Sequence, residues 1–272
     1  MSDFQPRKTP FHRAFLAAGL ALVVVMLTAV SFFNAKNLTE KPVALPSSLL
    51  FQLRQDEGSA VFSALVFPDG GDWQQLPSDL TLADTTVSLA ARGLDVRRTG
   101  QLLADEAQLE PVETWQLDRL GFAALLDSIG GIYLTPARQV TIEQVDGTLL
   151  TIGAGETRYL TGSLASDYVV AGGPDVAGER FAEVWHLLMR SVDGAALPVL
   201  TDSLGSTSRS TMESTQLVAV IEALQQREFA RPIAIEVLQS QVVVTDAGVV
   251  RVLTTEARDQ LIAAGLIVST ES

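Results

Sequence analysis

An uncharged apolar run over residues 14–33 constrains this chain more than any other feature. The run is 20 residues long and consists mainly of Ala, Leu and Val. At a rise of about 1.5 Å per residue, about 20 apolar residues form a helix that crosses the hydrocarbon core of a bilayer. Arg7, Lys8 and Arg13 precede the run, and only Asp3 opposes them. This basic flank predicts a cytoplasmic tail over residues 1–13, a single plasma-membrane span, and an extracytoplasmic remainder.

A cleaved signal peptide is the alternative interpretation of the same run. Ala29-Val30-Ser31 resembles a small-x-small cleavage site. The apolar segment of a signal peptide is usually about 7–15 residues long, so the membrane anchor is the preferred prediction. Residues 34–48 are polar and contain two prolines, which indicates a stalk. No linker divides residues 49–267, so one extracytoplasmic domain is predicted over residues 49–272.

The charge balance limits the classes of partner. The formal net charge is −13, and 16 of the 19 basic residues and 31 of the 32 acidic residues lie beyond residue 33. An acidic domain of this kind lacks the basic surface that binds nucleic acid, so nucleic acid is excluded as a partner. The chain contains no cysteine, which excludes disulfides and thiolate sites.

Strand and helix patterns alternate beyond the stalk. Strands are predicted at residues 49–53, 61–67, 73–76, 233–238 and 241–253, and a hairpin around Asp146-Gly147. Helices are predicted at residues 178–190, 212–229 and from Thr254 to Gly265, and a loop at 195–209. Residues 81–108 are predicted to be mixed and mostly helical. This interleaving predicts an α/β fold in which helices cover a mixed β-sheet.

The most informative stretch covers residues 115–168. Apolar residues spaced by three and four predict a helix, namely Leu117, Leu120, Phe122, Leu125, Leu126 and Ile129. Gly130-Gly131 ends this helix, because glycine readily adopts the left-handed conformation found at helix ends. The following Ile132-Tyr133-Leu134 predicts a short buried strand that stops before Pro136.

This stretch resembles the middle of the LytR-CpsA-Psr family. The resemblance is carried by GFAALLDSIGGIYL at 121–134, GAGETRYLTG at 153–162, and the subsequent Ala165 and Tyr168. It extends over about residues 49–190. Members of that family are membrane-anchored enzymes that move polyprenyl-pyrophosphate-linked glycopolymers onto peptidoglycan. The resemblance therefore implies a cell-envelope protein that handles a polyprenyl-phosphate lipid or a cell-wall polymer.

Several positions depart from the pattern that the family's chemistry uses. Phosphoryl transfer from a lipid pyrophosphate needs arginines around the phosphates and carboxylates that position magnesium. The chain has Ala60 in place of an acidic residue, and in place of arginines it has Ser78, Val170 and Ala177. Each missing arginine removes a charge-assisted hydrogen bond worth about 1.5–3 kcal/mol. These departures predict that turnover by the family's route is lost.

Arg180 and Asp79 match the family pattern and are the ligand-binding candidates. Arg180 is expected in the first turn of its predicted helix, where free backbone N–H groups favour a phosphate. Its alternative is a surface arginine that pairs with Glu179 or Glu183, and the alternative for Asp79 is an ordinary turn residue. No residue is assigned a catalytic role.

Other polar and apolar candidates have simpler explanations. Asp127 is predicted to be structural, and His186 to have a surface or packing role. No metal-ligand spacing, catalytic-triad order or phosphate-binding glycine motif occurs, so no metal and no cofactor is predicted. The family's prenyl tunnel has candidate lining residues whose alternative is ordinary core, namely Leu187, Leu188, Met189, Leu217, Val218 and Ile221.

Three functions follow. The preferred one is a non-catalytic, membrane-anchored envelope protein, a pseudoenzyme that binds a polyprenyl-linked glycopolymer or an envelope partner. The alternative is an active phosphotransferase that attaches glycopolymer to peptidoglycan, uses magnesium, and has regrouped its arginines from among Arg92, Arg97, Arg98, Arg138 and Arg158. The third is a structural protein without a ligand. Arginines clustered around one cleft favour the enzyme, and scattered arginines favour the other two.

Overall fold

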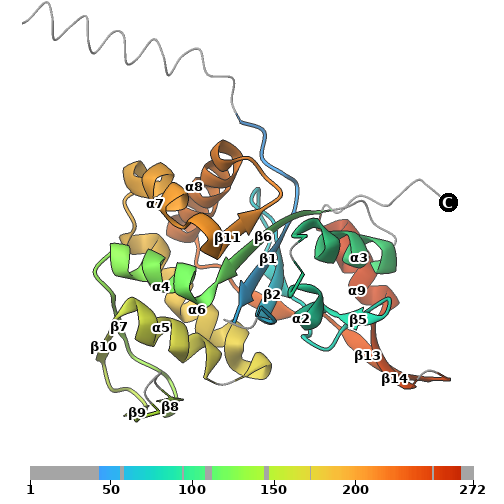
Figure 1. Cartoon of the computed structure of the whole chain (residues 1–272), viewed down its shortest axis with the longest axis horizontal. Helices are drawn as coiled ribbons and strands as arrows, with labels where there is room; N and C mark the ends of the chain where they lie inside the picture. Colours follow the sequence, from blue (N-terminus) through green and yellow to red (C-terminus); the bar gives the residue numbers. More distant parts are fainter. Residues whose placement is uncertain are drawn as a thin grey trace, which may run out of the picture. The chain divides into compact units, whose positions relative to one another are not determined.

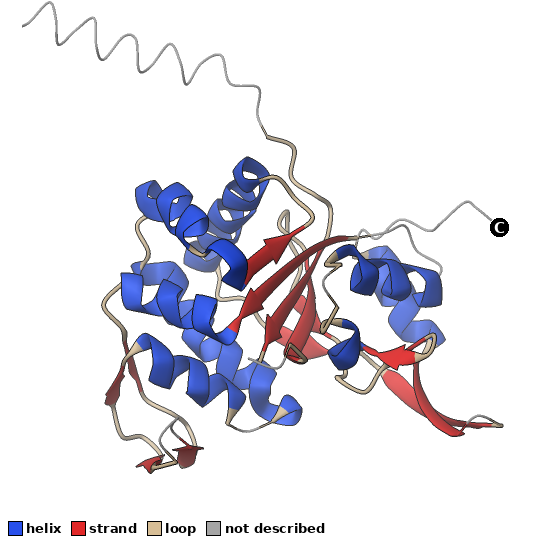
Figure 2. Cartoon of the chain, in the orientation of Figure 1, coloured by secondary structure: helices blue, strands red, loops and turns tan. Residues whose placement is uncertain are grey.

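A six-stranded mixed β-sheet forms the centre of the fold in the computed structural model (Figures 1 and 2). The structure describes residues 43–55, 58–93, 95–107, 112–143, 147–171, 173–246 and 248–264. The strand order is β11-β6-β1-β2-β3-β12. The strands are β1 (Leu49–Arg54), β2 (Ala60–Val66), β3 (Trp73–Gln75), β6 (Glu113–Asp118), β11 (Ser208–Ser210) and β12 (Ile235–Val237).

Strand register brings three distant segments together at the carboxyl end of β1. β1 and β6 run parallel, so Arg54 lies opposite Asp118. β1 and β2 run antiparallel, so Arg54 also lies opposite Ala60 at the start of β2. β3 is antiparallel to β2 and therefore ends towards the same side. This end of the sheet holds the positions that the family resemblance singles out.

Helices cover both faces of the sheet (Figure 1). One face packs against α4 (Arg119–Ser128), α5 (Gly162–Val170), α6 (Pro174–Ser191), α7 (Leu197–Ser203) and α8 (Ser214–Ala230). The other packs against α2 (Val87–Ala90), α3 (Arg97–Ala107) and α9 (Thr255–Ala263). Side chains alternate along a strand, so Phe51 belongs to the first core and Leu50 to the second.

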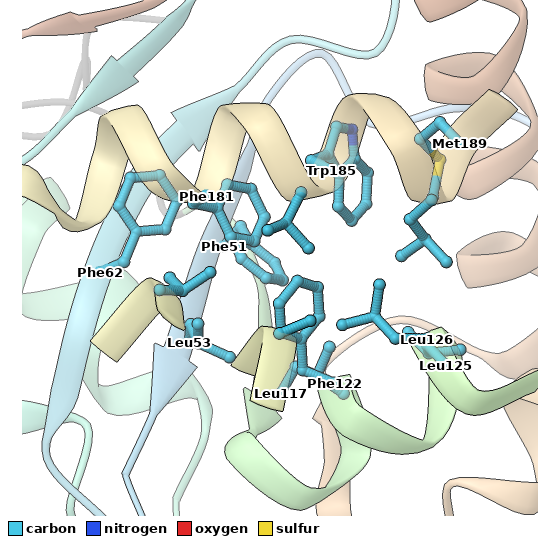
Figure 3. Close-up of a cluster of buried hydrophobic side chains, with 14 of the residues drawn as sticks. Phe51, Leu53, Phe62, Leu117, Phe122, Leu125, Leu126, Phe181, Trp185 and Met189 are labelled. Carbon is cyan, nitrogen blue, oxygen red and sulfur yellow. The ribbon is translucent and has the colours of Figure 1, made fainter. Parts of the chain in front are cut away.

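The first core is built around aromatic rings from the sheet, α4 and α6 (Figure 3). Phe181 of α6 stacks on Phe62 of β2 with ring centroids 4.6 Å apart, and it also packs against Phe51 and Phe122. Trp185 lies one helical turn further along α6, 5.4 Å from Phe181. Helix α6 is therefore pinned to the sheet along its length by large apolar side chains.

Two-stranded ribbons complete the domain. They are β4 (Thr81–Leu82) with β5 (Thr85–Thr86), β7 (Ile132–Leu134) with β10 (Arg158–Leu160), β8 (Val140–Glu143) with β9 (Leu149–Ile152), and β13 (Ser240–Thr245) with β14 (Gly248–Leu253). The hairpins predicted at 141–152 and 241–253 are confirmed. Short 3₁₀ turns lie at Gly194–Ala196 and Gly205–Thr207.

Helix α4 ends as the sequence predicts. Gly130 and Gly131 have φ angles of 82° and 80°, in the left-handed region that favours glycine. The Gly131 N–H donates to the Leu126 carbonyl at 2.9 Å, which satisfies a carbonyl at the helix end. Thr254 caps α9, because its hydroxyl accepts from the Ala257 N–H.

Three secondary-structure predictions were wrong, and a fourth, for residues 81–108, was correct. Residues 113–118 form β6, so Leu117 belongs to a strand and the helix begins at Arg119, with Leu120 exposed. Residues 195–209 contain α7 and the beginning of β11 instead of a loop. The described part of the region at 81–108 is mixed and mostly helical, as predicted, with the β4–β5 ribbon followed by α2 and α3. Helix α6 begins at Pro174, four residues before the predicted start, because proline fits the first position of a helix.

The predicted membrane anchor lies outside the described residues, as does most of the predicted stalk. Among the residues that are described, no helix is both long enough and apolar enough to cross a membrane.

Candidate functional site

Four positions where the resemblance expects an acidic or basic group hold uncharged side chains, namely Ala60, Ser78, Val170 and Ala177. Ala60 and Ala177 are both buried, and the Ala60 carbonyl accepts a hydrogen bond from the Ser88 hydroxyl. Val170 is the last residue of α5 and packs against the first core. Ser78 follows β3 and is partly buried.

Helix α6 lies directly against the end of β3 at this place. A Cβ atom on Gly178 would come within 1.9 Å of the Gln75 Oε1 atom and 2.8 Å of its Cδ atom. Gly178 therefore allows a closer approach of helix and strand than any side chain permits. Ala177, next to it, is fully buried. The place where the resemblance expects a phosphate site is thus filled by helix–sheet packing.

Arg180 lies in the second turn of α6, so the prediction of a first-turn position was wrong. The N–H groups of Gly178–Ala182 are inside the helix and are not free donors for a ligand. The Arg180 Nη1 atom donates to the Tyr168 carbonyl at 3.0 Å, and its guanidinium lies 5.1 Å from the centre of the Tyr168 ring. Arg180 is therefore held by a hydrogen bond and a cation–π contact within the protein.

Tyr168 connects Arg180 to a glutamate. The Tyr168 hydroxyl donates to the Glu183 Oε2 atom at 2.5 Å. Burial raises the pKa of Tyr168, and the hydrogen bond to Glu183 raises it further, while Arg180 lowers it. The tyrosine therefore stays protonated throughout the physiological range and serves as a fixed hydrogen-bond donor.

A small pocket, called the Arg180 pocket below, borders this group. It has a volume of about 110 Å³. Its lining includes Arg138, Arg180, Glu179 and Glu183, together with Tyr168 and the segment that follows β7. Ligand pockets for drug-sized molecules usually measure about 300–1,000 Å³, so this one suits only a small group. Two arginines and two glutamates leave its lining without net charge.

Asp79 lies in a different pocket from Arg180. Its Oδ1 atom is 2.8 Å from the Arg251 Nε atom, and its side chain is 62% exposed. The pocket beside it, of about 400 Å³, is lined by Gln75, Ser78, Arg251 and neighbouring residues. The structure therefore does not bring the two predicted ligand-binding residues together, and each has a partner within the protein.

Magnesium does not fit the residues present. Ala60 offers no oxygen ligand where the family has a carboxylate, and Asp79 is paired with Arg251. Within the described ranges, no three His, Asp or Glu side chains lie close enough together to hold a metal ion.

Asp127 and His186 have structural contacts. The Asp127 Oδ1 atom accepts from the Gly162 N–H at 2.7 Å, which ties the end of α4 to the start of α5. The His186 Nδ1 atom lies 2.5 Å from the buried Glu228 Oε1 atom of α8. Glu228 also accepts from the Ile233 N–H. Sequence reasoning found no partner for His186, because Glu228 lies 42 residues away.

Two of the five arginines considered for a regrouped active site lie close to another arginine. Arg138 lines the Arg180 pocket, and Arg92 lies beside Gly58, whose Cβ position is also close to Arg54. Arg97 lines a third pocket with Glu113. The Arg158 Nη1 atom lies 3.6 Å from the Glu156 Oε1 atom, and the Arg158 side chain is half-exposed. Arg98 is exposed on α3. The five arginines therefore do not all lie at one place in the described structure.

Arg54 is a basic residue that sequence reasoning missed. It is buried at the end of β1, where its Nε atom lies 3.0 Å from Asp118 and its Nη1 atom donates to Gln116. Burial lowers the pKa of Arg54, Asp118 raises it, and the nearby Arg209 lowers it. The available signal was the alternation of polar Gln52 and Arg54 in an otherwise apolar strand.

The candidate tunnel residues all belong to or pack against the first core. Leu188, Met189, Leu217 and Ile221 are buried, and Leu187 and Val218 are partly buried against them. Figure 3 shows Met189 beside Trp185 along α6. These residues are accounted for as core packing.

Comparisons with known proteins identify the fold. No family model and no curated protein sequence matches the chain. Solved structures do: a LytR-Csp2A-Psr enzyme from Actinomyces oris is 18% identical, with a TM-score of 0.62 over 84% of this chain and 95% of that one. B. subtilis TagV is 14% identical, with a TM-score of 0.60 over 81% and 97%. TagT bound to LI-WTA is 13% identical, with a TM-score of 0.58 over 82% and 90%. The family resemblance is confirmed at the level of the fold.

Proposed function

We propose that this chain, which has the fold of the LytR-CpsA-Psr enzymes, is a non-catalytic envelope protein that binds the phosphate group of a polyprenyl-linked glycopolymer. In this proposal residues 14–33 anchor it in the plasma membrane and the folded domain lies on the outer side. Phosphate binding takes place in the Arg180 pocket, without transfer chemistry.

The close packing of α6 against β3 carries the proposal. Gly178 leaves no room for a side chain next to Gln75, and Ala177 is buried where the resemblance expects an arginine. A transfer reaction needs several cations that converge on the developing charge. Here Arg180 is turned towards Tyr168, and Asp79 is paired with Arg251 in another pocket.

The phosphotransferase alternative receives less support. It requires the other arginines to gather around one cleft, and in the described structure they are spread over separate places. Arg54 lies at the expected end of the sheet, but it is buried and paired with Asp118. A purely structural role does not account for a pocket in which Arg138 and Arg180 occur together.

The Arg180 pocket limits what is bound. Its volume of about 110 Å³ is well below the roughly 300–1,000 Å³ of pockets that hold drug-sized molecules. That is enough for one phosphate group and too little for a sugar nucleotide. Glu179 and Glu183 lower the affinity for a multiply charged group, which favours a monophosphate over a pyrophosphate.

Substituting Arg180→Ala tests the contact. In the full-length chain, held in detergent micelles, we expect binding of a polyprenyl monophosphate to weaken by about 1.5–3 kcal/mol, because one charge-assisted hydrogen bond is lost. Calorimetric titration measures the difference. We also expect a stability loss of about 1 kcal/mol, because the contacts with Tyr168 disappear.

Arg190→Ala is the matched control, since Arg190 is an exposed arginine in the last turn of the same helix. It should leave affinity unchanged. Equal affinity of wild type and Arg180→Ala, or binding by neither, contradicts the proposed phosphate contact.

The membrane anchor has its own test. Because residues 14–33 are long enough to span a bilayer and follow a basic flank, the mature protein should keep its N-terminal segment. N-terminal sequencing of protein purified from membranes measures this. A mature chain that begins near Phe32 shows cleavage and rules out the anchor.

A further inference from the structure

The β13–β14 ribbon exposes apolar side chains that the rest of the described fold does not cover. Its outer part projects from the folded domain (Figure 1). Val242 and Val244 of β13 and Val249 of β14 are 57%, 80% and 71% exposed. Val244 lies opposite Val249, and side chains two residues apart share a face of a strand, so the three valines lie on one face of the ribbon. This surface is called the valine face below.

Of the two edges of the ribbon, the described residues cover only the one on β14. Leu80 forms a parallel bridge with Arg251 of β14, and the Arg251 N–H donates to the Thr81 hydroxyl oxygen at 3.2 Å. No described strand pairs with the outer edge of β13. Alternate residues of β13 therefore direct their main-chain N–H and C=O groups away from β14 and towards solvent.

Strand β13 has none of the features that usually keep an open edge from pairing. Proteins protect such edges with charged side chains, prolines, bulges or very short strands. β13 spans six residues with the sequence SQVVVT, and its register with β14 is continuous. Four of the six side chains are β-branched and none is charged, a composition that favours strand pairing. The outer edge of β13 is therefore ready to accept one more strand.

The sequence of β13 fits a second copy of itself. Two antiparallel copies related by a twofold axis place one residue opposite its own counterpart. With Val243 at that centre, Val242 of one copy lies opposite Val244 of the other, and Gln241 lies opposite Thr245. Directly opposed β-branched side chains stabilise a pair of strands. The two valine faces then join on one side of a four-stranded sheet.

Other registers match less well. A centre at Val242 would place Val244 opposite Ser240 and Val243 opposite Gln241, so valines would lie against polar side chains. A centre at Val244 would shorten the paired part of β13 to three residues, 243–245. The side chains therefore favour the register centred on Val243.

Charged groups do not oppose this register locally. Asp246 follows β13 and lies opposite the uncharged Ser240 of the other copy. Arg251 belongs to the inner strand and is paired with Asp79 of its own chain. The remaining electrostatic cost is the general repulsion between two chains of net charge −13, which salt screens.

We propose that β13 pairs antiparallel with β13 of a second copy of this chain, so that the two ribbons form one four-stranded sheet. A two-stranded ribbon is only marginally stable by itself, and further strands stabilise it. An edge contact between two ribbons is small beside the roughly 1,200–2,000 Å² of stable interfaces, so the dimer is reversible. This contact goes beyond the proposed phosphate binding and does not depend on it.

Disulfide trapping tests the contact, because the natural chain contains no cysteine. The full-length Val243→Cys chain, in detergent micelles with oxidised glutathione, should form a disulfide-linked dimer. Residues directly opposite in an antiparallel pair have Cα atoms about 4.5–5.5 Å apart, which a disulfide can bridge. Chains carrying Val242→Cys should cross-link to chains carrying Val244→Cys more than either cross-links to itself.

Val199→Cys is the matched control for random collision. Val199 is 72% exposed on α7, so its thiol is more accessible than one at the partly exposed Val243. Its cross-linked fraction should nevertheless be at least about fivefold lower, because no pairing holds two copies of this position within disulfide range.

Sedimentation equilibrium in density-matched detergent measures the dimer without a cross-link. Wild type should associate reversibly with a Kd of about 0.1 mM or below, and added salt should strengthen the association. Val244→Lys should weaken it at least about tenfold, because a lysine on an edge strand opposes pairing. The unfolding midpoint of this variant should match wild type, because the Val244 side chain is mostly exposed.

Equal cross-linking of Val243→Cys and Val199→Cys overturns the proposal, as does an unchanged dimer constant in Val244→Lys. Absence of wild-type association at about 0.1 mM also overturns it and leaves an extended segment of another protein as the occupant of the edge. A dimer that persists in the Arg180→Ala variant supports the contact whether or not phosphate binds, so the two proposals fail separately.

Discussion

Substituting Phe181→Ala is expected to lower the free energy of unfolding by about 3–5 kcal/mol, because it removes a fully buried ring and leaves a cavity. Phe181 packs against rings from β1, β2, β3, α4 and α6, so several neighbours lose contacts together. For a domain of this size, about 1 kcal/mol shifts the unfolding midpoint by about 2–4 °C. The expected fall is therefore roughly 6–20 °C.

Tryptophan fluorescence of the full-length chain in a mild detergent measures this midpoint. Phe229→Ala is the matched control, because Phe229 is 55% exposed near the end of α8 and should change stability by less than about 0.5 kcal/mol. A similar midpoint for both variants contradicts the account that Phe181 joins α6 to the sheet.

Arg54→Ala is expected to cost about 3 kcal/mol of stability. The substitution leaves the Asp118 carboxylate and the buried Gln116 side chain without their guanidinium partner. Removing one member of a buried ion pair destabilises a protein by about 3–5 kcal/mol, and the lower end applies because Asp118 is partly exposed. The same thermal unfolding measurement gives the difference.

A double-mutant cycle separates the energetic coupling of Arg54 and Asp118 from the packing that each side chain loses on its own. Arg54→Ala combined with Asp118→Ala should cost less than the sum of the two single variants, because each single variant already removes the interaction between the two groups. Arg158→Ala is the control, since its ion pair with Glu156 is exposed and worth at most about 1 kcal/mol. Additive single and double variants show that Arg54 and Asp118 are not energetically coupled.

The elements predicted correctly from the sequence are those with local signals. The strands at β1 and β2 are continuous apolar runs, the β13–β14 hairpin has alternating residues on either side of a turn, and Gly130-Gly131 ends α4. β6 was missed because Leu117 also fits the helical spacing of the residues that follow. The start of α6 was missed because Gly178 was taken as the helix start, although Pro174 is a typical first residue.

The site depends on contacts that local patterns do not contain. Arg180 was identified through the family pattern, but its orientation is set by Tyr168 in the preceding helix. The partners of Arg54 lie on a strand more than 60 residues away. Asp79 is held by Arg251, from the other end of the domain sequence. Tertiary packing therefore decides which charged groups are available to a ligand.

The central claim is that this fold has lost transfer chemistry in this chain. In the direct test, the full-length chain in vesicles is incubated with a saccharide linked to polyprenyl pyrophosphate, an acceptor glycan and magnesium. The release of polyprenyl phosphate is then measured. An enzyme known to perform this transfer is the positive control for the assay conditions. The account predicts no release of polyprenyl phosphate above a no-protein sample, because the described residues bring together neither converging cations nor metal ligands. Release above that level, abolished by a chelator, contradicts it.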